Sequence, residues 1–245
     1  MPSATRAGQT TQTTQTTQGW VLHRRPWRES SALVDVLTQD FGRLGLVAKG
    51  ARSQRSAWRG LVEPFVPLAL SYSQKGEMGT LRSLETSGQR VALSGTALWC
   101  GLYANELVLY LIDRDDAVEG LFEAYSELVT GLDSDTELGA ALRLFEWRLL
   151  TLLGVAPSLD QQAHDLGPIT LNGHYRLESE AGFVAVAAAS ADTISGAAIG
   201  WLSNPTASAA CSEVAQQARH ITRQLIDHQL AGRTLKTRAL LRQLQ

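Results

Sequence analysis

The spacing of apolar residues changes near Ser94, and this change limits the folds that the chain can adopt. Before Ser94, apolar residues gather in short runs rich in β-branched side chains and separated by glycine-containing turns, as in β-strands. After Ser94, they return every three or four residues over longer stretches, as in helices. The sequence therefore predicts an α+β protein, in which a small β-barrel is followed by an α-helical domain.

Five runs in the first module have the composition of strands, and they lie at residues 20–23, 31–38, 44–48, 65–72 and 80–86. Short strands with such turns favour a Greek-key barrel of the oligonucleotide-binding type, the OB-fold. An SH3-like barrel would give nearly the same pattern. Pro64 and Pro67 favour an edge position for the fourth strand, because proline cannot donate a ladder hydrogen bond.

Residues 1–19 consist almost wholly of Thr, Gln, Ser, Ala and Gly. Such a segment cannot bury enough apolar surface to offset the entropy lost on ordering, so we expect a disordered extension. The OB-fold domain is then expected over residues 20–94 and the helical domain over residues 95–245.

The second module has the pattern of a helical bundle, with helices expected at residues 97–113, 117–130, 135–153, 195–202, 209–230 and 234–243. Asp135 or Thr136 is a suitable N-cap for the third helix. Residues 167–189 depart from the helical period, because two short apolar runs flank a glycine-containing turn. We therefore expect a β-hairpin inserted into the helical domain.

The net charge of −2 conceals an uneven distribution. Residues 1–96 contain twelve Lys and Arg against six Asp and Glu, whereas residues 97–245 contain ten against eighteen. The balances are +6 and −8. This asymmetry favours a basic, nucleic-acid-facing module joined to an acidic scaffold or partner-binding module.

A cluster of cations follows the third expected strand, with Trp58 among them, and consists of Lys49, Arg52, Arg55 and Arg59. Cations supply affinity for a polyanionic backbone, and an aromatic ring offers a face to a base. The alternative is a solvated basic loop. Further candidate DNA-binding cations are Arg24, Arg25, Arg28 and Arg43. Trp27 and Trp58 suit either base stacking or core packing.

A second basic cluster, near the C-terminus, consists of Arg233, Lys236 and Arg238. It either extends a DNA-binding track or stabilises a helix end. Motifs for catalysis are absent: there is no phosphate-binding loop, no G-x-S-x-G and no H-E-x-x-H, and Asp113, Asp115 and Asp116 suit a cap or a solvated turn. We expect no enzyme active site.

Only two cysteines occur, Cys100 and Cys211, and they are not in a C-x-x-C spacing. We expect free thiols in a reducing cytosol rather than a disulfide. No apolar run is long enough to span a membrane, and the N-terminus lacks the apolar core of a secretory signal. The sequence thus predicts a soluble intracellular protein.

Five stretches together resemble the RecO family of bacterial DNA-repair proteins: residues 21–27 (VLHRRPW), 42–52 (GRLGLVAKGAR), 101–107 (GLYANEL), 145–150 (FEWRLL, followed by LG at 153–154) and 232–238 (GRTLKTR). The resemblance implies a non-catalytic recombination mediator, located in the bacterial cytoplasm at the nucleoid. Such proteins bind single- and double-stranded DNA and anneal complementary strands. With RecR, they help to load RecA onto DNA coated by single-strand-binding protein.

The sequence departs from this family at a zinc site that many members carry, because residues 160–189 contain no cysteine. His164 and His174 are too few to form a closed zinc site, so we expect neither metal nor cofactor. Packing of Tyr175, Leu177, Phe183 and Val184 would then hold the hairpin.

The resemblance also implies that the helical domain binds the acidic C-terminal tail of single-strand-binding protein, which ends in an apolar aromatic residue with a free carboxylate. The candidate tail-binding residues are Arg143, Phe145, Trp147 and Arg148, among which Arg143 matches the family position best. An arginine beside an apolar pocket suits such a tail. The alternative is an intrahelical pair of Arg143 with Glu146, and a Trp147 that lies in the core.

Overall fold

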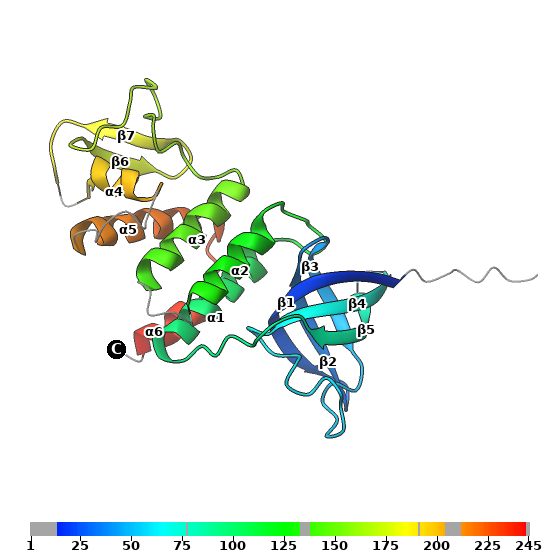
Figure 1. Ribbon diagram of the computed structural model, residues 1–245. Coiled ribbons are helices and arrows are strands. Elements are labelled where there is room, and N and C mark those ends of the chain that lie inside the picture. Colours follow the sequence, from blue (N-terminus) through cyan, green and yellow to red (C-terminus); the bar gives the residue numbers. More distant parts are fainter. Residues whose placement is uncertain (1–13, 77, 133–137, 191, 204–211, 244–245) are drawn as a thin grey trace, which may run out of the picture. The chain divides into compact units, whose positions relative to one another are not determined.

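The computed structural model describes residues 14–76, 78–132, 138–190, 192–203 and 212–243. The chain divides into two compact units, Met1–Arg90 and Val91–Gln245, each with its own core (Figure 1). The first unit contains a closed β-barrel and the second contains helices with a small sheet. This is the fold class that the sequence predicts.

Five strands form the barrel: β1 (Thr14–Trp27), β2 (Ser31–Thr38), β3 (Gly42–Ala48), β4 (Pro67–Lys75) and β5 (Met78–Thr86). Their order around the barrel is β1-β2-β3-β5-β4, and β4 closes the circle by pairing with β1. Every pairing is antiparallel except that of β3 with β5, which joins Leu46 to Gly79 and Val47 to Thr80. This Greek-key order is that of the OB-fold, and it decides between the two barrels that the sequence allows.

The first strand begins earlier than the sequence pattern indicates. Thr14 pairs with Ser73 and the pairing continues to Gly19 opposite Leu68, so residues 14–19 belong to the barrel and not to a disordered extension. Backbone hydrogen bonds to β4 hold this polar stretch, and its threonines are β-branched residues that suit a strand. The rest of the expected extension, residues 1–13, lies outside the described residues.

The fourth strand is not an edge, because β4 pairs with both β1 and β5. Pro67 is tolerated because it is the first residue of β4, where its missing N–H costs least. A Cβ atom on Gly79 of β5 would lie 2.6 Å from Leu46 Cδ2 of β3, so a larger residue at this position would force the Leu46 side chain to shift.

The barrel core consists of the inward-facing residues of all five strands, and it includes Val34, Val36, Leu44, Leu46, Leu68, Leu70 and Tyr72. These residues are at most 3% exposed. Along β2, β3 and β4, these core residues recur at every second position, as the period of a β-strand requires.

The helical unit contains α1 (Gly95–Leu111), α2 (Leu121–Gly131), α3 (Leu138–Leu152), α4 (Gly196–Trp201), α5 (Ser212–Gln229) and α6 (Lys236–Gln243). Helix α3 contacts α1, α2 and α5, so its apolar side chains lie at the centre of the unit. Phe145, Leu149 and Leu150 are almost fully buried there. The proposed N-caps Asp135 and Thr136 lie outside the described residues.

A three-stranded sheet is inserted between α3 and α4, in the order β7-β6-β8, with β6 (His174–Glu178), β7 (Gly182–Val186) and β8 (Ile194–Ser195). The expected hairpin is therefore present, with a third short strand added. Tyr175, Leu177 and Phe183 are buried. Helix α5 fixes the sheet, since Gln224 Nε2 donates to Leu177 O (3.0 Å) and Gln217 Oε1 accepts from Ser195 N (2.9 Å).

Candidate functional site

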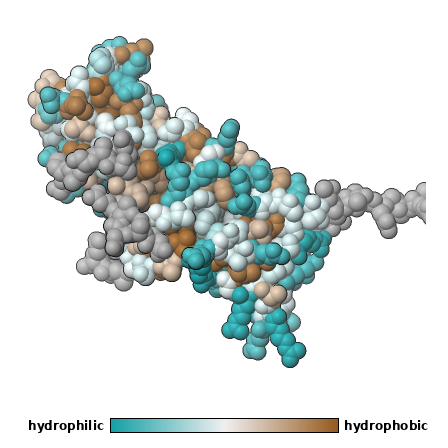
Figure 2. All heavy atoms as spheres, viewed as in Figure 1, coloured by the Kyte–Doolittle hydropathy of each residue, from teal (hydrophilic) through white to brown (hydrophobic). Residues whose placement is uncertain are grey.

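The loop between β3 and β4, residues 49–66, is here called the basic loop. It is a chain of tight turns, in which Ser53 N donates to Gly50 O (3.0 Å) and Arg59 N donates to Ser56 O (3.2 Å). Trp58 and Leu61 pack against the barrel core. This apolar anchor turns one side of the loop inward and leaves Lys49, Arg52, Arg55 and Arg59 exposed. Figure 2 shows hydrophilic side chains projecting where Figure 1 draws this end of the barrel.

Arg52 joins the basic loop to the turn between β1 and β2. Its Nη1 donates to Arg28 O (3.1 Å) and to Glu29 O (3.4 Å), and its backbone N donates to Ser30 O (2.8 Å). Arg28 adopts a left-handed backbone conformation with φ of 53° in this turn. The β1–β2 turn and the basic loop thus lie side by side. The exposed cations on and near them are here called the basic surface, and they are Arg24, Arg25, Arg28, Lys49, Arg52, Arg55 and Arg59.

Two predicted cations of the barrel already have carboxylate partners. Arg24 forms an ion pair with Glu63 at 2.8 Å, with half of the arginine side chain still exposed. Arg43 forms a pair with Asp35 at 3.2 Å, with 12% of either side chain exposed. Arg43 is therefore turned into the barrel wall, whereas Arg24 remains on the surface.

The two tryptophans of the barrel have different environments. Trp27, at the end of β1, is 43% exposed, which is unusual for so large an apolar side chain. Trp58 packs against the core and is only partly accessible. Trp27 is thus the ring that a base could reach.

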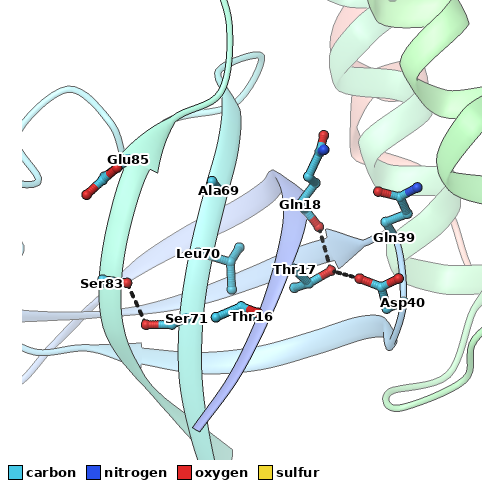
Figure 3. A pocket seen from close by; sticks show the side chains of 10 residues that line it. All are labelled: Thr16, Thr17, Gln18, Gln39, Asp40, Ala69, Leu70, Ser71, Ser83 and Glu85. Atoms are coloured by element: carbon cyan, nitrogen blue, oxygen red, sulfur yellow. Dashed lines mark hydrogen bonds between the residues drawn. The ribbon is translucent and has the colours of Figure 1, made fainter.

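A shallow cavity of about 440 Å³ lies elsewhere on the barrel, against β1, β4, β5 and the turn after β2 (Figure 3). Hydroxyl and amide side chains form most of its wall, and Thr17 Oγ1 donates to Asp40 Oδ2 (2.7 Å). Its charged lining residues are Asp40 and Glu85. Because both repel phosphate, this cavity is a poor place for nucleic acid.

The helical unit contains a cavity of about 540 Å³, here called the arginine pocket. It lies between α1, α3, α4, α5 and α6. Its apolar walls include Trp99, Leu138, Leu142 and Trp201. Its charged lining residues are Arg143, Arg219, Arg223, Arg238 and Glu146. An apolar chamber with an excess of cations suits an apolar group attached to an anion.

A buried hydrogen-bond network underlies one wall of the pocket. Glu146 Oε1 accepts hydrogen bonds from Arg143 Nη2 (2.8 Å) and from the Tyr103 hydroxyl (2.8 Å). Arg143 Nη1 also donates to Thr222 Oγ1 (3.3 Å), and Arg238 Nη2 donates to the Tyr103 hydroxyl (2.8 Å). The intrahelical alternative for Arg143 is therefore present, and it coexists with a place in the pocket wall.

Burial keeps the neutral groups of the pocket neutral. It raises the pKa of the Tyr103 hydroxyl, and the nearby Glu146 carboxylate raises it further. Burial also raises the pKa of the Cys100 thiol, which lines the pocket. The charge in the pocket therefore comes from its arginines and from Glu146.

The other predicted tail-binding residues do not line the pocket. Phe145 is buried in the core against Tyr125, with ring centroids 6.3 Å apart. Trp147 is 8% exposed, and Arg148 pairs with Glu127 on the surface. The pocket instead uses residues that sequence reasoning missed, chiefly Arg219 and Arg223 on α5. Their four-residue spacing on an amphipathic helix places them on one face, but nothing in the sequence connects that face to α3.

The C-terminal cations do not form one surface. Arg233 lies over the Tyr110 ring at 5.9 Å and donates to Tyr110 O, while Arg238 points into the arginine pocket and also pairs with Asp227. Lys236 is exposed at the start of α6, where its backbone N donates to Glu106 Oε1 (2.7 Å). These contacts favour structural roles for Arg233 and Arg238.

Metal ligands are not grouped in the described part of the chain. Within it, no three His, Cys, Asp or Glu residues are close enough to hold a metal ion. His164 Nε2 lies 3.5 Å from Glu178 Oε2. None of the described helices is long and apolar enough to cross a membrane.

Comparison with known proteins identifies both units. The family model for "Recombination protein O N terminal" matches residues 12–90, and the model for "Recombination protein O C terminal" matches residues 92–239. DNA repair protein RecO of Haemophilus influenzae (strain PittGG) is 35% identical over 226 residues, which cover 92% of this chain and 95% of that protein. The RecO protein of Alkalilimnicola ehrlichii is 41% identical over 231 residues, covering 92% and 90%. Since the matches run through both the barrel and the helical unit, the chain belongs to the RecO family of DNA repair proteins.

Proposed function

We propose that this protein is a recombination mediator that binds single- and double-stranded DNA and anneals complementary strands. With RecR, it helps to load RecA onto DNA coated by single-strand-binding protein. The observation that carries this proposal is the basic surface, where Arg52 joins two cation-bearing segments of an OB-type barrel. We expect the protein to act in the bacterial cytoplasm, at the nucleoid, where its DNA substrate lies.

The basic surface suits the phosphate backbone better than any one base. Lys49, Arg55 and Arg59 are exposed on a loop and can each meet a phosphate without a fixed geometry. Trp27 adds a ring on which a base can stack whatever its identity. Binding is therefore expected to be independent of sequence and to weaken steeply with salt.

Annealing needs no covalent chemistry from the protein. Two strands held by their phosphates expose their bases, and neutralised backbones repel each other less, so that pairing is faster. We therefore assign the protein a mediator role without a catalytic residue, metal or cofactor.

The arginine pocket supports the second half of the proposal, which is binding of the acidic tail of single-strand-binding protein. The apolar walls match the aromatic residue at the end of the tail, and the arginines match its carboxylate. Docking on the tail would deliver the barrel to coated DNA.

The decisive experiment measures, by fluorescence, the rate at which two complementary strands anneal when each is coated with single-strand-binding protein. We expect this protein to accelerate annealing on the intact coat and to lose most of that effect when the coat protein lacks its tail. Equal acceleration with and without the tail would contradict tail docking. No acceleration even on naked strands would contradict the annealing role.

A protein-interaction scaffold is the competing function, and one observation favours it. Arg24 and Arg43 already have carboxylate partners within the barrel, which leaves fewer cations unengaged for DNA. Titrations with a labelled oligonucleotide and with a labelled acidic peptide separate the two functions. Tight peptide binding beside negligible oligonucleotide binding at moderate salt would favour the scaffold.

A further inference from the structure

Two stretches that the proposed function leaves unused, residues 101–107 and 232–238, lie against each other in the helical unit. The first belongs to α1 and the second leads into α6, and these two helices are in contact (Figure 1). Within residues 231–240, whose side chains the structure describes, Leu235 is the only apolar side chain that is buried. A helix that buries so little apolar surface depends on its polar contacts to stay in place.

Glu106 of α1 caps the N-terminus of α6. Its Oε1 accepts a hydrogen bond from Lys236 N (2.7 Å), and its Oε2 accepts from Thr237 N (2.9 Å) and Thr237 Oγ1 (2.6 Å). Backbone N–H groups in the first turn of a helix have no acceptor within the helix, and a carboxylate there also interacts favourably with the helix dipole. The capping group that usually comes from the preceding residue is thus supplied by another helix.

The Tyr103 hydroxyl, also on α1, holds α6 at a second point. It accepts from Arg238 Nη2 (2.8 Å) and donates to Glu146 Oε1 (2.8 Å). Glu146 is 1% exposed and also accepts from Arg143 Nη2 (2.8 Å). A chain of hydrogen bonds therefore runs from α6 through α1 to the buried ion pair of α3. Since Arg238 lines the arginine pocket, α6 contributes to the pocket wall while this chain is closed.

The turn before α6 has the features of a hinge. Ala231 and Gly232 both have left-handed backbone conformations, with φ of 48° and 85°. This conformation is unfavourable for alanine, because its Cβ atom crowds the backbone. Both residues are exposed. The turn can therefore change its backbone angles without disturbing a core.

We infer that Tyr103 and Glu106 form a clasp, here called the α6 clasp, which holds α6 in the wall of the arginine pocket and can open while the helical core stays folded. Opening withdraws Arg238, so the pocket presents four arginines when the clasp is closed and three when it is open. The clasp does not depend on what the pocket binds, and it is therefore independent of the proposed function.

The test is hydrogen exchange of the full-length protein, followed by mass spectrometry. Glu106→Gln keeps the shape of the side chain but removes its charge, and the exchange of α6 should become about tenfold faster, as expected when a helix cap is lost. The amide of Ala239 is the best reporter. It donates to Leu235 O (3.2 Å) and not to Glu106, so its exchange measures the opening of α6 itself. Exchange of α3 should stay at the wild-type rate.

Further variants test the clasp in both directions. Tyr103→Phe and Arg238→Gln each remove the second point of attachment and should also accelerate the exchange of α6. Ala231→Gly relieves the backbone strain of the closed turn and should slow it about threefold. Glu123→Gln on α2 and Arg176→Ala on β6 change exposed side chains outside the clasp, and both should leave the exchange unchanged.

Cys100 provides a second readout, because its side chain lines the arginine pocket. In a Cys211→Ser background, the uncharged thiol reagent N-ethylmaleimide should modify Cys100 severalfold faster when Glu106→Gln is present, since α6 then covers the pocket for less of the time.

Three results would overturn the inference. Unchanged exchange of α6 in Glu106→Gln would show that this carboxylate does not hold the helix. An equal rise of exchange in α3 would show that α6 opens only when the whole unit unfolds. Faster exchange of α6 with unchanged modification of Cys100 would remove α6 from the wall of the pocket.

Discussion

The barrel and the helical unit both present arginines, but they hold them in different ways. On the barrel, the cations of the basic loop are exposed, and Arg52 is held by backbone carbonyls. In the helical unit, the arginines lie on helices, and Arg143 is fixed by the buried Glu146. The first arrangement tolerates imprecise contacts, whereas the second fixes direction and distance.

This difference matches the two anions that we propose for them. A DNA backbone repeats its phosphates, so that several partly redundant cations bind it well. A peptide has one terminal carboxylate, which must meet a donor at a defined place. Mutations should therefore produce graded effects on the barrel and abrupt effects in the arginine pocket.

The largest effect is expected from Glu146→Ala. It would leave the buried Arg143 cation without its carboxylate, at a cost of about 3–5 kcal/mol in the free energy of unfolding. Urea unfolding, monitored by tryptophan fluorescence, measures this loss. The double variant Arg143→Leu/Glu146→Leu should recover much of it, and a loss below about 1 kcal/mol in the single variant would show that the pair is not essential.

The next effect concerns DNA affinity. Replacing Lys49, Arg55 and Arg59 together by alanine should weaken binding of single strands roughly 100-fold at 0.1 M salt, because three phosphate contacts are lost. The slope of log K against log salt should become about 2 smaller. Arg176→Ala is the control, and an unchanged slope in the triple variant would remove the basic loop from the DNA site.

A smaller effect separates the two tryptophans. Trp27→Ala should weaken single-strand binding about tenfold through lost stacking, with stability unchanged. Trp58→Ala should instead lower barrel stability, because the ring packs against the core. Oligonucleotide titration measures the DNA affinity of both variants, and thermal unfolding measures their stability. Equal effects of the two variants on DNA binding would contradict the distinction.

The smallest effect is expected from the ion pair of Arg24 with Glu63. Both side chains are partly exposed, so Glu63→Ala should change stability by less than about 1 kcal/mol. The same substitution should strengthen DNA binding slightly, since it removes an anion and releases Arg24. Weaker binding in Glu63→Ala would show that the pair orders the surface.

Much of the fold could be predicted from local patterns, since strands and helices follow their own apolar periods. The start of β1 at Thr14 could not, because long-range backbone pairing to β4 holds a stretch whose side chains are polar. Likewise, the pattern does not distinguish Trp27 from Trp58, since burial depends on what surrounds each ring.

The candidate sites likewise differ in whether local sequence or tertiary packing brings their residues together. The basic loop is local in the sequence, and a run of cations without carboxylates indicates it directly. The arginine pocket joins residues from α1, α3, α5 and α6, so that only tertiary packing brings Arg143 near Arg219. Phe145 and Trp147 were expected beside the tail because they neighbour Arg143 in the sequence, but the helix turns them into the core.

The contact of Arg52 with the β1–β2 turn has a consequence for the entropy of binding. One nitrogen of its guanidinium is shared between two carbonyls, and an arginine has five N–H donors in all. The remaining donors can meet a phosphate while the two loops stay joined. The two loops are thus aligned when the protein folds. A DNA strand that binds them then orders few further groups, so that less conformational entropy is lost on binding.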